Sequence, residues 1–158
     1  MGRIVATLAV VVALLFSAGS AWADYEGAAA YERGDYKTAF QKFSKEAEQG
    51  HADAQYLLYI MYKNGEGVPK NLKKAVKWLR KSADQNDPGS QAILSLQYAQ
   101  GNGVPKSLVR SYMWASLADV NGYKHAGAIL EGISEHMTRD QIAKAQELAS
   151  EWWEKHGN

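Results

Sequence analysis

The sequence contains no cysteine among its 158 residues. Disulfides, metal-thiolate sites, cysteine nucleophiles and a lipid-modified N-terminal cysteine are therefore all excluded. The chain is long enough to bury a real core as one domain, and it must hold that core together by packing alone. It also lacks an excess of charge of one sign, because 18 basic residues stand against 17 acidic ones. We expect no nucleic-acid partner on these electrostatic grounds.

Catalytic motifs are absent as well. The sequence contains no Gly-x-Ser-x-Gly elbow, no Ser-x-x-Lys pair and no His-Glu-x-x-His helix. Its four histidines show no spacing typical of metal ligands; they are His51, His125, His136 and His156. We therefore expect no catalytic residue, no metal site and no cofactor.

A long apolar stretch begins the chain. One positive charge at Arg3 precedes an uninterrupted apolar run from Ile4 to Phe16, and Ala21-Trp22-Ala23 supplies a small-x-small cleavage site. This pattern predicts that residues 1–23 are a secretory signal peptide, which places the mature protein in the periplasm or outside the cell. An uncleaved membrane anchor stays open as the alternative, because Ile4 to Ala23 spans 20 residues without a charge. Contact with a membrane is expected only in that second case.

An internal repeat dominates the rest of the chain. The sequence "GEGVPK" at 65–70 returns as "GNGVPK" at 101–106, a shift of 36 residues. The same shift aligns three helix residues in each copy, which are Gln55, Leu58 and Tyr62 with Gln91, Leu94 and Tyr98. Apolar residues at spacings of three and four indicate helices, and self-similarity at this period indicates stacked repeat units.

The repeated loop is best interpreted as a turn between antiparallel helices. A dinucleotide-binding loop would need a preceding strand and a third glycine, and a Walker loop would need Gly-Lys-Ser/Thr after four intervening residues. Here a helix is expected before the loop, and a proline stands before the lysine. We expect the first glycine of each loop to end a helix with positive φ, the proline to prevent its continuation, and the next polar residue to be an N-cap. The expected turn residues are Gly65, Gly67, Pro69, Gly101, Gly103 and Pro105, with Asn71 and Ser107 as the N-caps.

Gly-x-Gly-Val-Pro followed by Ala-x-x-Trp, with Leu and Tyr shortly upstream, resembles the Sel1-like repeat, a relative of the tetratricopeptide repeat. The resemblance covers roughly 25–137 and implies an all-α fold, a right-handed α-solenoid of antiparallel helix hairpins, and a role in protein contacts, commonly in the bacterial envelope. One departure is Tyr59, because the family usually has a small residue there and the next repeat has Ser95. Some secreted relatives are associated with β-lactam binding or hydrolysis, so a cell-wall-directed enzyme or glycan binder is the alternative function.

The resulting organisation is a signal peptide followed by one repeat domain at 24–158. Its units lie near 25–50, 51–86, 87–122 and 123–137, and a capping helix at 138–156 is opened by the capping box Thr138 to Gln141. The sequence predicts eight helices. They are expected near 25–33, 35–49, 51–63, 71–85, 87–99, 107–121, 123–136 and 138–156.

The predicted function is an exported, non-enzymatic adaptor that binds a protein or peptide. The expected contact strip on the concave side consists of Tyr56, Ile60, Lys63 and Leu96, although these side chains could instead pack between hairpins. The alternative surface is a basic face, suited to an acidic partner or simply solvated, formed by Lys70, Lys73, Lys74, Lys77, Arg80 and Lys81. Trp152 and Trp153 are adjacent on one helix, so one of them is a further candidate for partner contact.

Overall fold

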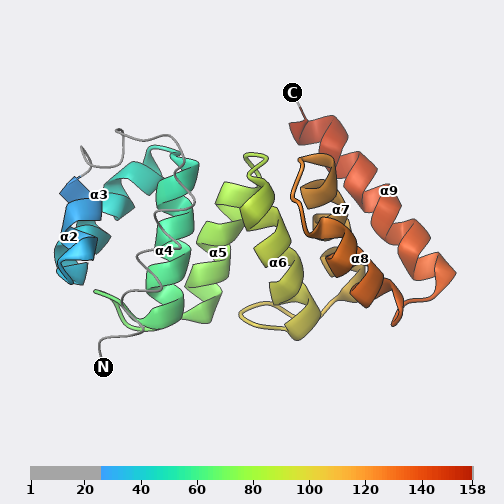
Figure 1. Cartoon of the computed structure of the whole chain (residues 1–158), viewed down its shortest axis with the longest axis horizontal. Coiled ribbons are helices and arrows are strands. Elements are labelled where there is room, and N and C mark those ends of the chain that lie inside the picture. The colour runs from blue at the N-terminus through green and yellow to red at the C-terminus, as the bar shows by residue number, and fades with distance from the viewer. Residues whose placement is uncertain (1–25, 158) are drawn as a thin grey trace.

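The computed structural model describes residues 26–157, and this part of the chain forms eight helices and no strand (Figure 1). The helices are α2 (Glu26–Glu32), α3 (Tyr36–Glu48), α4 (Ala52–Asn64), α5 (Leu72–Ala83), α6 (Pro88–Gln100), α7 (Leu108–Val120), α8 (Ala126–Ser134) and α9 (Arg139–His156). The predicted signal segment at 1–23 lies outside the described residues. None of the described helices has the length and the apolar character needed to cross a membrane.

The helices stack along one long axis, from α2 at one end to α9 at the other (Figure 1). Consecutive helices pack against each other as far as α8, and α9 packs against α7. The predicted all-α solenoid of helix hairpins is confirmed. The largest boundary error is at α8, because the Tyr123 amide donates to the Ala118 carbonyl at 2.8 Å and keeps residues 121–125 in the preceding turn.

The predicted N-caps are present at three helices. The Asn71 side chain accepts a hydrogen bond from the Lys74 amide at 2.9 Å, and the Ser107 hydroxyl accepts one from the Arg110 amide at 3.2 Å. The capping box at Thr138 is also confirmed, with both of its hydrogen bonds to Gln141 in place. Each of these side chains satisfies an amide that the helix itself leaves unpaired.

Buried glutamines connect successive hairpins. The Gln55 amide donates to the Ala47 carbonyl at 3.1 Å, and one repeat later Gln91 donates to the Ala83 carbonyl at the same distance. Asn121 in turn donates to the Gln91 side-chain oxygen at 2.9 Å. The two glutamines satisfy carbonyls in the last turn of α3 and of α5, so the same bond joins neighbouring units at the interval of the repeat.

The two glycines of each loop have separate positions. Gly101 lies at φ 76° as the C-cap of α6, and Gly65 occupies the same place after α4. Gly103 also has positive φ, and a Cβ atom built on it would lie only 2.4 Å from the Leu72 carbonyl oxygen. The second glycine therefore lets the loop approach the first residue of α5 in the preceding hairpin, and Gly67 makes the equivalent approach to the Tyr36 carbonyl.

The last helix reaches back across one repeat. Trp152 of α9 packs on Trp114 of α7, and its indole nitrogen donates to the Asp84 carboxylate at 3.3 Å. The His156 ring stacks on Trp152 with 4.5 Å between centroids, while the Asn86 amide donates to the His156 carbonyl at 3.2 Å. The C-terminal part of α9 is thus fixed to the turn between α5 and α6 as well as to α7.

Candidate partner-binding site

The predicted concave strip is largely covered in the structure. Ile60 is only 9% exposed, and Tyr56 is half-buried with its ring 5.9 Å from that of Tyr59. Lys63 is exposed and holds its ammonium group 5.6 Å from the centroid of the Tyr59 ring. Leu96 is 39% exposed. Lys63 and Leu96 are therefore the members of the strip that offer substantial surface to a partner.

Tyr59, the departure from the repeat pattern, is a buried side chain. Burial raises its pKa to about 12, with a smaller contribution from Tyr56. At the equivalent place in the next unit, the Ser95 carbonyl accepts a hydrogen bond from the Ser111 hydroxyl at 2.8 Å. The α6 position thus holds a small serine bonded to α7, whereas the α4 position is filled by an aromatic ring. The aromatic ring does not separate the hairpin, because α4 and α5 pack as extensively as α6 and α7.

The basic face predicted on α5 is mostly exposed. Lys73, Lys74, Lys77 and Lys81 are exposed, as is Lys70 in the preceding loop, and Arg80 is half-buried. Two of the lysines lie on aromatic rings, at 4.2 Å from the Trp78 centroid for Lys81 and 5.6 Å from the Tyr62 centroid for Lys74. Within residues 26–157, the ion pairs join Lys42 to Glu26 and Lys144 to Glu147, so none of them neutralises α5.

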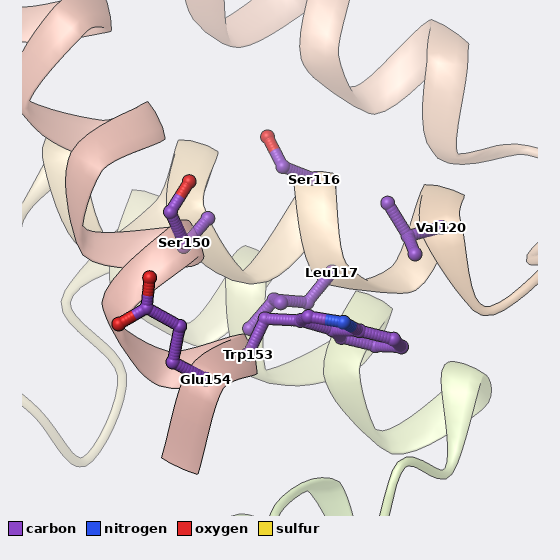
Figure 2. A pocket seen from close by; sticks show the side chains of 7 residues that line it. Ser116, Leu117, Val120, Ser150, Trp153 and Glu154 are labelled. Atoms are coloured by element: carbon purple, nitrogen blue, oxygen red, sulfur yellow. The ribbon is translucent and has the colours of Figure 1, made fainter. Parts of the chain in front are cut away.

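A pocket of about 390 Å³ lies between α7 and α9 (Figure 2). Its lining consists of Ser116, Leu117, Val120, Ala149, Ser150, Trp153 and Glu154. Val120 is 67% exposed and Trp153 is 38% exposed, which is unusual for side chains of this size. The surface is mainly apolar and carries two hydroxyls and one carboxylate.

The arrangement of α9 explains why Trp153 faces this pocket. Adjacent helix residues point about 100° apart. Trp152 is buried against Trp114, so Trp153 is turned outward, where Figure 2 shows its ring beside Leu117 and Val120. The docking of α9 on α7 thus creates the pocket and fixes the direction of its largest side chain.

The pocket has one formal charge, on Glu154. No cation belongs to the lining, and neither of the ion pairs found in the described part of the chain includes this carboxylate. Such a surface can receive an apolar side chain and can also attract a cation beside it. Among the described residues, no group of three or more histidines and carboxylates is placed to hold a metal ion.

Val120 was missed at the level of the sequence, although the repeat contains a signal for it. The corresponding residues one and two units earlier are Asp84 and Glu48. At the end of α7, the exposed apolar side chain of Val120 therefore stands where the earlier units have an acid, and it lies next to the exposed Trp153. Only the packing of α9 on α7 shows that these two residues share one surface.

Residues 52–87 and 88–118 match the Sel1 repeat family. A Sel1 repeat protein from Oxalobacter formigenes, of known structure, is 35% identical, and the similarity covers 74% of this chain and 86% of that protein with a TM-score of 0.58. The chain therefore belongs to the Sel1 repeat family. Proteins of this family are generally scaffolds for protein interactions.

Other similarities extend over less of the related proteins. A protective antigen of uropathogenic Escherichia coli strains with an SLR fold is 27% identical, with 96% of this chain and 30% of that chain covered and a TM-score of 0.73. DAP3-binding cell death enhancer 1 from Rattus norvegicus is 44% identical over 43 residues, which are 27% of this chain. The chain spans only 8% of the length of that relative.

Proposed function

We propose that this chain is an exported adaptor that binds a protein or peptide partner and performs no chemical step of its own. The observation that carries the proposal is the pocket between α7 and α9, where Val120 and Trp153 are exposed side by side. The general role of Sel1 repeat proteins as interaction scaffolds supports it. Export is supported by the apolar run at Ile4 to Phe16 and the site at 21–23.

The chemistry of the pocket indicates what the partner presents. Trp153 is a rigid aromatic anchor, and such residues often contribute ~2 kcal/mol or more to a binding energy when they become buried. The floor formed with Leu117 and Val120 accepts an apolar side chain. Glu154 favours a lysine or arginine next to that side chain, because its carboxylate has no cation among the lining residues.

The concave strip and the basic face remain predicted contact surfaces beside this pocket. Leu96 is as exposed as Trp153 and is the best-placed apolar residue of the concave strip. A partner that engages the strip would be insensitive to changes in the α7/α9 pocket. Single substitutions at Leu96 and at Trp153 therefore show which of the two surfaces binds the partner.

Site-specific photo-crosslinking tests the proposal. A benzophenone amino acid introduced at Val120 should give a defined crosslinked product with an envelope extract, and Trp153→Ala should abolish that product. The matched control places the same group at Gln41, which is exposed on α3 at the other end of the stack. A product that forms equally from Gln41, or that survives Trp153→Ala, would contradict binding at the pocket. Turnover of a β-lactam or of peptidoglycan by the purified protein would instead support the cell-wall enzyme.

A further inference from the structure

Two arginines from different helices converge on the ring of Tyr98. The Arg80 guanidinium of α5 donates a hydrogen bond to the Tyr98 hydroxyl, and its central carbon lies 5.6 Å from the ring centroid. The guanidinium carbon of Arg110, in α7, lies 5.8 Å from the same centroid. Tyr98 itself, in α6, is only 3% exposed. Two cationic side chains, one from α5 and one from α7, thus lie near one buried ring in α6.

Comparison with the neighbouring repeat units shows that a unit folds without a cation at the position of Arg80. One repeat earlier, Tyr62 has a single cation over its ring, Lys74 at 5.6 Å, which corresponds to Arg110. The position of Arg80 is occupied by serine in the units before and after, at Ser44 and Ser116. The double cation is therefore particular to the Tyr98 unit.

The charges of this pair have no counter-charge in the described part of the protein. Neither Arg80 nor Arg110 takes part in the ion pairs found there. Because both guanidinium carbons lie within 5.8 Å of one ring centroid, the two like charges repel each other, and an anion that contacts both removes that cost. Arg110 also lies in the first turn of α7, where the positive end of the helix dipole adds to the attraction for an anion. Arg110 is exposed and Arg80 is half-buried, so a ligand can reach both.

We propose that Arg80 and Arg110 form a binding site for a phosphate group, with Tyr98 orienting the Arg80 guanidinium. A bidentate contact with one guanidinium fork already uses both oxygens of a carboxylate. A phosphate has more oxygens, which point in different directions, so it can offer a separate pair to each of two forks that come from different helices. This site involves α5, α6 and α7 and shares no residue with the pocket at Trp153, although Arg80 also belongs to the basic face. It therefore does not depend on partner binding at the pocket.

The test is a titration of the protein with inorganic phosphate, followed by the ¹⁵N resonances of the arginine side chains. Saturable shifts are expected for Arg80 and Arg110. Arg110→Gln and Arg80→Gln should each weaken binding by about tenfold or more. Glutamine at position 80 retains a donor for the Tyr98 hydroxyl, which protects the fold. Lys74→Gln is the matched control, because it removes the single cation of the preceding unit and should leave phosphate affinity unchanged.

The outcomes separate the proposal from its competitors. Absence of saturation, equal weakening by Lys74→Gln, or acetate binding as tightly as phosphate would each overturn it. Trp153→Ala should leave phosphate affinity unchanged, so a failure of the proposed function does not affect this test. Vesicles of phosphatidylglycerol, compared with phosphatidylcholine, identify the source of the phosphate. If the protein is retained on phosphatidylglycerol vesicles only when Arg110 is present, the phosphate belongs to a lipid headgroup. If the protein binds inorganic phosphate but is not retained on these vesicles, the ligand is a soluble phosphate.

Discussion

The indole rings of Trp114 and Trp152 meet edge to face, with 5.5 Å between their centroids. Trp152 also donates to the Asp84 carboxylate, so one side chain joins α9 to α7 and to the turn after α5. Because Trp152 is buried there, its neighbour Trp153 is directed outward into the pocket. The stability of the end of the solenoid and the proposed binding surface therefore depend on the same contact.

Trp152→Ala should destabilise the protein by about 3–5 kcal/mol, because it leaves a large cavity against Trp114 and removes a hydrogen bond. Urea unfolding measures this loss. Trp153→Ala is the matched control on the next residue, and its cost should be at least about 2 kcal/mol smaller, since that ring is 38% exposed and lines an open pocket. Equal losses in the two variants would show that α9 is not held through Trp152.

Replacing the second glycine of the loop by alanine should destabilise the protein more than the strain of a positive φ alone would. Gly122 has φ 84° with open space around it, so Gly122→Ala should cost about 1 kcal/mol. Gly103→Ala should cost at least about 3 kcal/mol, because the new Cβ would also clash with the Leu72 carbonyl and force two hairpins apart. Melting temperatures of the two variants test the difference. Similar values would contradict the close approach between the loop and α5.

The helices were predictable because their signals are local and repeated. The spacing of Leu58 and Tyr62, the N-cap at Asn71 and the capping box at Thr138 each depend on residues within a few positions of one another. The pocket was not predictable in this way, since Val120 and Trp153 are brought together only by the packing of α9 on α7.

The concave strip shows a second limit of sequence reasoning. Helical periodicity places Ile60 on a face of α4, but it does not reveal how much of that face the neighbouring hairpins cover. In the structure Ile60 is buried, while Leu96 one repeat later is exposed. Equivalent positions of a repeat therefore differ in exposure according to the side chains around them, which the period alone does not determine.

Alkaline pH should weaken the protein partly through Tyr59. Burial raises the pKa of this phenol to about 12 in the folded state, compared with about 10 in an unfolded chain. Below pH ~10 both states are protonated and the stability is intact; above it the unfolded state ionises first. We expect stability to fall between about pH 10 and pH 12, by up to ~2 kcal/mol from this group. Urea titrations at increasing pH test this, and an unchanged slope in Tyr59→Phe would contradict the contribution of Tyr59.

Export predicts a defined N-terminus. Cleavage after Ala23 would leave a mature chain that begins at Asp24. Intact mass spectrometry of the protein recovered from a bacterial envelope fraction should show this species. Recovery of only the full-length chain, bound to membranes, would favour the anchor alternative and contradict cleavage.

Binding of the crosslinked partner to three forms of the protein tests the central claim most directly. Trp153 and Leu96 expose almost the same fraction of their surface, 38% and 39%, so each alanine variant removes one partly exposed apolar side chain, from the pocket and from the concave strip respectively. Calorimetry should show that Trp153→Ala weakens the partner by about 30-fold or more, equivalent to ~2 kcal/mol, while Leu96→Ala binds as the unchanged protein does. Full affinity in Trp153→Ala together with a loss in Leu96→Ala would contradict the pocket between α7 and α9 as the binding site.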